Sequence, residues 1–188
     1  MRPAVFLDRD GTLLKFVDHL IDPAQVELSP GAVVALQRLR NSGHAIIVIT
    51  NQPLIGRGLA TPDQVAQVNE EMNRKLRALG SSIDAVYVCP VAPTGNDPTI
   101  IEHVDRKPGP GLLMRAAVDH GIQLDRSWMV GDSVRDVLAG RNARCFGQVL
   151  LTNGKPIRNE EIQRISPVLT APNLCGAVDL ILRVKLKA

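Results

Sequence analysis

Residues Phe6-Leu7-Asp8-Arg9-Asp10-Gly11-Thr12 end an apolar run with two carboxylates that are one residue apart. The run Ala4 to Leu7 is typical of a buried strand, and ligands of open α/β sheets bind at the carboxyl ends of the strands. Side chains two apart on a strand share a face, so Asp8 and Asp10 can converge on one cation or substrate atom. Gly11 lets the chain turn sharply away. A simple turn is the alternative interpretation, since Asp-Gly is a common turn pair.

Two later segments repeat this pattern. The β-branched run His44 to Ile49 leads into Thr50-Asn51-Gln52, and Trp128 to Val130 leads into Gly131-Asp132-Ser133. Three predicted strands therefore end in small polar or acidic groups. Together with Arg106-Lys107-Pro108 in a loop, these carboxylates, hydroxyls, amide and cations suit a divalent metal beside a phosphate group.

The composition bounds the class of protein. The 188 residues fit one domain, 1–188, and a hydrophobic fraction of 45% with 3% aromatics predicts an aliphatic core. The net charge of +3 is mild, and no basic run carries interleaved aromatics, so we expect a small anionic ligand and no nucleic acid. We find no signal peptide, no membrane-length apolar stretch and three widely spaced cysteines. These features favour a reducing cytoplasm and no membrane contact. A monomer is the expected state.

Strand and helix patterns alternate along the chain, which predicts an α/β fold: a Rossmann-like three-layer sandwich with a mostly parallel central sheet. Strands are expected at 4–7, 44–50, 83–89, 127–130, 145–151 and around 168. Helices are expected at 30–41, 62–79, 110–120, from 133, at 159–164 and at 173–184. Thr61 is the expected N-cap of the second helix, with Pro62 at its first position. The segments 15–29, 53–60 and 90–108 are expected as loops, the first too short to hold a folded cap domain.

The chain resembles the haloacid dehalogenase superfamily of phosphatases, whose motifs match in order. They are Asp8-Arg9-Asp10-Gly11-Thr12, Thr50-Asn51, Lys107, and Gly131-Asp132 followed by Asp136. Within that superfamily, Asp8 to Gly11, Thr50 to Gln52 and Arg106 to Gly111 resemble the heptose bisphosphate and histidinol-phosphate phosphatases. The resemblance implies a haloacid dehalogenase-like fold with a minimal cap or none.

The resemblance also implies the chemistry. Asp8 would be the nucleophile that forms an aspartyl-phosphate, and Asp10 the acid and base that serves the leaving oxygen and then the water. Mg²⁺ would be held by the Asp8 and Asp132 carboxylates and the Asp10 backbone carbonyl, which are hard oxygen ligands.

Other motif residues would bind the phosphoryl group. Thr50 and Asn51 would hold its oxygens, and Lys107 would neutralise their charge. Asp136 would position Lys107. Each has a plainer alternative: Lys107 as a solvated loop lysine, and Ser133 with Asp136 as a helix capping pair.

Substrate selection is expected from Gln52, Arg57 and Arg106. If the substrate carries two phosphates, the two arginines are the expected clamp for the distal one. Arg57 as an ordinary surface arginine is the alternative.

The resemblance breaks at a structural zinc, whose usual Cys-x-His…Cys-x-Cys ligands precede Arg106. This chain keeps Cys89 but has Val91 at the histidine position, and His103 and Asp105 replace the late cysteines. Since Val91 cannot coordinate metal, we expect no zinc, and prolines stiffening the loop instead.

The favoured function is a Mg²⁺-dependent phosphatase of a phosphorylated sugar, most simply D-glycero-D-manno-heptose 1,7-bisphosphate. Such an enzyme would remove the 7-phosphate in carbohydrate metabolism that feeds lipopolysaccharide biosynthesis. Histidinol-phosphate phosphatase is the alternative within enzymes, and phosphotransfer to an acceptor other than water is another. A non-catalytic phosphosugar-binding scaffold is the alternative from a different class.

Overall fold

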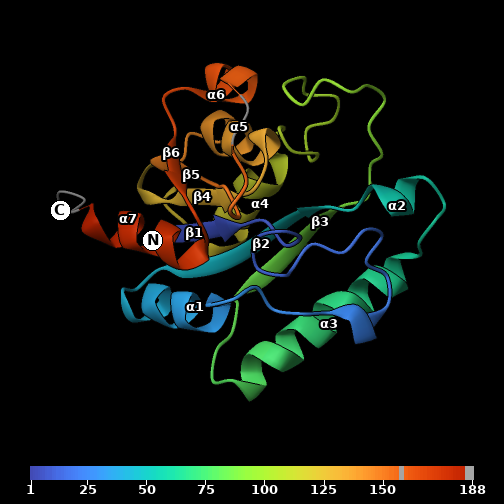
Figure 1. The fold of residues 1–188 in the computed structure, drawn as a ribbon, viewed down its shortest axis with the longest axis horizontal. Helices are drawn as coiled ribbons and strands as arrows, with labels where there is room; N and C mark the ends of the chain where they lie inside the picture. The colour runs from blue at the N-terminus through green and yellow to red at the C-terminus, as the bar shows by residue number, and fades with distance from the viewer. Residues whose placement is uncertain (157–158, 185–188) are drawn as a thin grey trace.

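The computed structural model describes residues 1–156 and 159–184 and is built on one parallel sheet of six strands (Figure 1). The strands lie in the order β3-β2-β1-β4-β5-β6, and every pair is parallel. Their bounds are β1 Ala4–Leu7, β2 Ala45–Asn51, β3 Ala85–Cys89, β4 Trp128–Gly131, β5 Gly147–Leu151 and β6 Leu169–Ala171. The predicted three-layer α/β fold is confirmed.

Helices cover both faces of the sheet because side chains alternate along each strand. Val5 and Leu7 of β1 pack with one set of helices: α1 Ala32–Asn41, α3 Pro62–Ala78 and α7 Leu174–Arg183. Figure 1 shows α1 and α3 below the sheet. Ala4 and Phe6 pack on the other face with α4 Gly111–His120 and α5 Val134–Asn142. The short helix α6 Asn159–Ile165 lies beside α5. No described helix is long and apolar enough to cross a bilayer.

The connections place a crevice beside β1. The chain runs from β1 through β2 to β3 on one side and then returns to add β4 on the other side of β1. Such a reversal opens a crevice at the carboxyl ends of the two central strands, where ligands of α/β sheets bind. Asp8 and Asp132 follow these two strands.

Helix α3 begins where the sequence predicts. The Thr61 side chain accepts a hydrogen bond from the Gln64 backbone N–H, and the Gln64 side chain accepts one from the Thr61 N–H. This capping box satisfies two donors that a helix start leaves without partners, and Pro62 follows at the first position. The expected N-cap is confirmed.

Several predicted boundaries are wrong by a few residues. Helix α1 was expected from Pro30 but starts at Ala32, because Gly31 takes a left-handed conformation with φ 76° that a helix cannot continue. The predicted loop 53–60 contains a short helix, α2 Pro53–Gly56, and the loop 15–29 contains a 3-10 turn, η1 Pro23–Gln25. Prolines at the first positions favour both turns.

Candidate active site

Asp8 and Asp132 follow the adjacent strands β1 and β4, and Gly11 leaves room for the Asp132 carboxylate. Gly11 has a φ of 75°, and a Cβ atom there would lie 2.0 Å from the Asp132 Oδ2. Any other residue would therefore strain the turn and displace the carboxylate. Oxygens of Asp8, Asp132 and Asp136 lie within 4.8 Å of one another.

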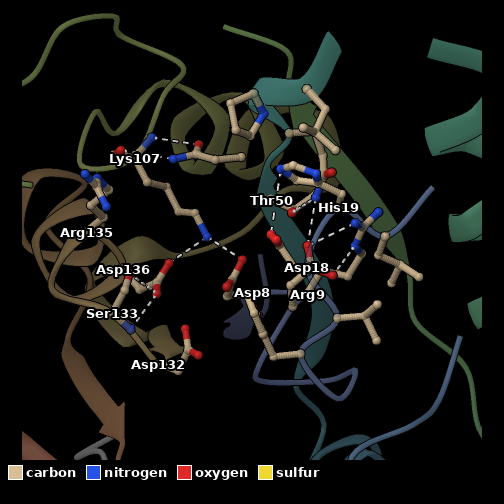
Figure 2. Close-up of a pocket in the computed structure, with 18 of the residues that line it drawn as sticks. Asp8, Arg9, Asp18, His19, Thr50, Lys107, Asp132, Ser133, Arg135 and Asp136 are labelled. Carbon is tan, nitrogen blue, oxygen red and sulfur yellow. Dashed lines mark hydrogen bonds and ion pairs between the residues drawn. The ribbon is translucent and has the colours of Figure 1, made fainter. Parts of the chain in front are cut away.

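Lys107 provides a buried cation between two of these carboxylates (Figure 2). Its Nζ lies 2.6 Å from the Asp8 Oδ1, 2.6 Å from the Asp136 Oδ1 and 2.8 Å from the Ile49 carbonyl oxygen. The side chain is 3% exposed. The interpretation of Lys107 as a solvated loop lysine is wrong.

The pKa values record how crowded this cluster is. Burial raises the pKa of Asp8 to about 8, with Lys107 opposing the shift and Asp136 adding to it. Burial and the Asp136 charge raise the pKa of Asp132 to about 6. Burial alone would lower the pKa of Lys107, but the Asp136 and Asp8 carboxylates raise it above its usual range. The lysine stays charged, and one cation does not balance the surrounding acids.

Asp136 combines both roles that the sequence left open. Its Oδ2 accepts hydrogen bonds from the Ser133 N–H (3.0 Å) and the Ser133 hydroxyl (2.6 Å), which ties down the start of α5. Its Oδ1 faces Lys107. Gly131 allows this packing, since a Cβ there would lie 2.3 Å from the Asp136 Cγ. The same carboxylate therefore anchors the helix and holds Lys107 in place.

Asp10 is held by Arg9, to which the sequence analysis assigned no role, and by Gln52, which was expected to select substrate. Arg9 lies between the two acids in the sequence, and its side chain is fully buried. It donates hydrogen bonds to the Asp10 Oδ1 (3.1 Å) and Oδ2 (2.9 Å) and to the Asn69 Oδ1 of α3 (2.9 Å). Gln52 donates to the Asp10 Oδ2 at 2.8 Å and to the Thr50 Oγ1 at 2.9 Å. Arg9 thus fixes Asp10 to the adjacent helix. The sequence signal that could have identified Arg9 was a charged residue at the end of a buried strand.

Thr50 and Asn51, the last two residues of β2, make different contacts. Thr50 is buried and lines the same cavity as Asp8. The Asn51 carboxamide exchanges two 3.1 Å hydrogen bonds with the backbone N–H and C=O of Lys107. Asn51 was expected to contact phosphoryl oxygens, and its contacts in this structure instead hold the Lys107 segment against β2.

These side chains surround a cavity of about 330 Å³, within the range of small-ligand sites. All eleven residues singled out from the motifs line it: Asp8, Asp10, Thr50, Asn51, Gln52, Arg57, Arg106, Lys107, Asp132, Ser133 and Asp136. The structure adds a wall that the sequence analysis treated only as a loop, Phe16 to Leu20, and adds Arg135 of α5. Figure 2 shows Asp18 and His19 of that loop on the side of the cavity away from Arg135.

The segment 90–108, where relatives were expected to bind zinc, is organised here by carboxylates. Glu102 accepts hydrogen bonds from the Thr94 and Gly95 backbones and the Thr94 hydroxyl. Asp105 accepts two hydrogen bonds from Arg115, and its N–H donates to the His103 Nδ1. These contacts engage His103 and Asp105, two of the three candidate zinc ligands. The absence of bound zinc stays a prediction, which metal analysis of the purified protein would test.

The acidic cluster fits a hard divalent cation. Within residues 1–156 and 159–184, Asp8, Asp132 and Asp136 are the group of potential ligands close enough to share an ion. Their donors are all carboxylate oxygens, which suit Mg²⁺. Two of the three have raised pKa values, first because they are buried and further because the Asp136 charge lies close to them.

Comparisons with known proteins agree with this geometry. The profile of the HAD-hydrolase-like family matches residues 104–177. The D-glycero-beta-D-manno-heptose-1,7-bisphosphate 7-phosphatase of Pasteurella multocida is 37% identical over 169 residues, covering 90% of this chain and 92% of that protein. The D-glycero-D-manno-heptose-1,7-bisphosphate 7-phosphatase of Thermosynechococcus vestitus is 35% identical over 187 residues, covering 96% and 95%.

A solved structure extends the similarity to the fold. The D,D-heptose 1,7-bisphosphate phosphatase of B. bronchiseptica, complexed with magnesium and phosphate, superimposes with a TM-score of 0.81 at 26% identity and covers 96% of this chain and 98% of that one. With full-length relatives above 30% identity, the chain belongs to the haloacid dehalogenase superfamily, in the branch of the heptose bisphosphate phosphatases, and is a phosphoric monoester hydrolase.

Proposed function

We propose that this hydrolase is a Mg²⁺-dependent phosphomonoesterase that removes the 7-phosphate of D-glycero-D-manno-heptose 1,7-bisphosphate. The observation that carries the proposal is the convergence of Asp8, Asp132 and Lys107 in one cavity. The substrate is supported by the names of relatives that match along most of the chain, and the metal by a similar structure solved with magnesium and phosphate.

Asp8 is assigned as the nucleophile. An oxygen of its carboxylate attacks phosphorus, the bond from phosphorus to the sugar oxygen breaks, and an aspartyl-phosphate forms. The contact with the Lys107 Nζ fixes the Asp8 carboxylate at 2.6 Å. Because burial raises the pKa of Asp8 to about 8, this group needs added positive charge to be an anion at neutral pH.

Asp10 is assigned as the general acid and base. It gives a proton to the departing sugar oxygen and takes one from the water that hydrolyses the aspartyl-phosphate, so the group returns to its starting state. The hydrogen bonds from Arg9 and Gln52 orient its carboxylate. During turnover, Asp10 must give up part of these hydrogen bonds in order to contact the substrate oxygen.

Asp8 and Asp132, with the Asp10 backbone carbonyl, are assigned as the protein ligands of Mg²⁺. When bound, the ion supplies charge that neutralises the phosphoryl oxygens and the crowded carboxylates. Lys107 adds a second positive charge 2.6 Å from the Asp8 Oδ1, and Thr50 lines the same cavity. Arg57 and Arg106 are assigned to substrate selection because both line this cavity.

A phosphate-release panel tests the proposal. It compares both anomers of heptose 1,7-bisphosphate, histidinol phosphate and simple sugar phosphates, with Mg²⁺ and with a chelator. We expect fastest release from a heptose bisphosphate and none with chelator. Faster release from histidinol phosphate would replace the proposed substrate.

Asp8→Asn keeps the side-chain shape and should lower kcat by roughly 10⁴-fold or more, while Asp63→Asn, which changes an exposed residue, should leave kcat unchanged. Binding of heptose bisphosphate without release by the wild type would support the scaffold alternative.

A further inference from the structure

Arg135 lies in the active-site cavity on a wall to which no role has yet been assigned. It is in the first turn of α5, two residues after Ser133, and lines the same cavity as Asp8 and Lys107. Figure 2 shows its side chain on the α5 side of Lys107, across the cavity from Asp18 and His19. Its position beyond the Lys107 ion pairs separates it from the proposed reaction centre.

Four arginines line this cavity. Arg9 is paired with Asp10, and the other three are Arg57, Arg106 and Arg135. Burial lowers the pKa of Arg106, and the charges of Arg135 and Arg57 lower it further, so these cations oppose one another. The Arg106 Nη1 donates to the Val91 carbonyl at 2.8 Å, and its Nε lies 4.0 Å from Glu102. The guanidinium groups of Arg57 and Arg135 make no hydrogen bond or ion pair with the described side chains. Arg57 and Arg135 are therefore two cations of the cavity that no described acid pairs with directly.

None of the described acids that line the cavity forms an ion pair with Arg57 or Arg135. Asp8 and Asp136 are paired with Lys107, and Asp10 with Arg9. Asp132 belongs to the proposed metal site. Asp18 lies 3.7 Å from the His19 Nε2, on the side of the cavity away from Arg135. A group of like charges without matching acids is unfavourable unless an anion binds among them, and guanidinium groups bind phosphate through paired N–H donors.

We infer that Arg135 is a specificity-determining residue that, with Arg57 and Arg106, binds a second anionic group of the substrate away from the scissile ester. This inference rests on the proposed function and deepens it, because it requires a substrate with two anionic groups. The second group is held by side chains from three separate segments, after β2, before α4 and at the start of α5.

The alternative role for Arg135 is structural and depends on its charge interaction with Asp97. The hydrogen bonds from Thr99 lower the pKa of Asp97, and the charges of Arg164 and Arg135 add to this effect. Asp97 already pairs with Arg164 at 3.2 Å and accepts two hydrogen bonds from Thr99. If Arg135 acted by holding the loop through Asp97, then Asp97→Asn would reproduce the effect of removing Arg135.

The test compares two substrates that differ only in the second phosphate: D-glycero-D-manno-heptose 1,7-bisphosphate and the corresponding heptose 7-phosphate. The ratio of their kcat/KM values is measured for the wild type, Arg135→Gln, Arg135→Lys and the control Asp97→Asn. Loss of a charge-assisted contact should lower the ratio by about 10–100-fold in Arg135→Gln, mainly through KM. Arg135→Lys should restore part of the ratio, and Asp97→Asn should keep the wild-type ratio.

The outcomes separate the inference from the proposed function. An equal loss on both substrates in Arg135→Gln, a ratio within twofold of wild type, or the same fall in Asp97→Asn would each overturn the role of Arg135. Release of phosphate from neither sugar by the wild type would overturn the proposed function itself. Melting curves of each variant identify any loss that is due to unfolding, and Arg57→Gln, which changes an exposed residue, supplies a second measurement of the clamp.

Discussion

Replacing Lys107 with methionine removes a cation that contacts both Asp8 and Asp136. Methionine keeps much of the length and apolar stem but leaves two buried carboxylates without the Nζ that lies 2.6 Å from each. Removing one partner of a buried ion pair costs about 3–5 kcal/mol. We expect a loss of that size in the metal-free protein above neutral pH.

The pH dependence follows from the raised pKa of Asp8. Between about pH 4 and 8, folded Asp8 keeps a proton that the unfolded chain has lost, so the free energy of unfolding decreases as pH rises. In the wild type this decrease ends near pH 8, where folded Asp8 ionises. Lys107 lowers the pKa of Asp8, so Lys107→Met should raise the pKa of Asp8 further. In this variant the free energy of unfolding should therefore keep decreasing above pH 8, by about 1.4 kcal/mol per pH unit.

The assay is urea unfolding with chelator at pH 5 and pH 9. Lys107→Met should lose more stability at pH 9 than at pH 5, by about 1 kcal/mol or more. Lys15→Met is the matched control, since Lys15 forms an exposed pair with Glu27, and should cost less than about 1 kcal/mol at both pH values. An equal loss at pH 5 and pH 9, or a loss as small as that of the control, would refute the electrostatic reasoning.

Three further predictions follow from the site. Gly11→Ala should destabilise the protein by about 1–3 kcal/mol and weaken Mg²⁺ binding, because its Cβ would meet Asp132 at 2.0 Å; melting and calorimetric titration measure both. In the wild type, Mg²⁺ at 100 times its dissociation constant should add about 2.7 kcal/mol of stability, and Asp132→Asn should remove most of that gain; an equal gain in the variant would contradict the assigned ligand. Arg9→Met should cost about 3–5 kcal/mol and lower kcat, because Asp10 and Asn69 both lose a buried partner; urea unfolding and steady-state kinetics check this, and a change below 1 kcal/mol would argue against it.

The fold was predictable because its signals are local. Apolar runs such as 44–49 have only one way to be fully buried in a chain of alternating strands and helices, which is a parallel sheet covered on both faces. Thr61, Pro62 and Gln64 specify the start of α3 through contacts within one turn. Helix α1 was less predictable, since Gly31 packs against Cys175 of α7, and a Cβ at that glycine would lie 2.6 Å from the sulfur.

The sequence by itself determined that Asp8, Thr50 and Asp132 would gather, because each lies at the carboxyl end of a buried parallel strand and such strands end at one edge of the sheet. Only the tertiary structure decided what surrounds them. Arg9 is buried against Asp10 and Asn69, and Arg135 shares a cavity with Arg57 and Arg106, through contacts between segments far apart in the chain. Strand periodicity depends on neighbouring residues, whereas the partner of a long charged side chain depends on which distant segment packs beside it.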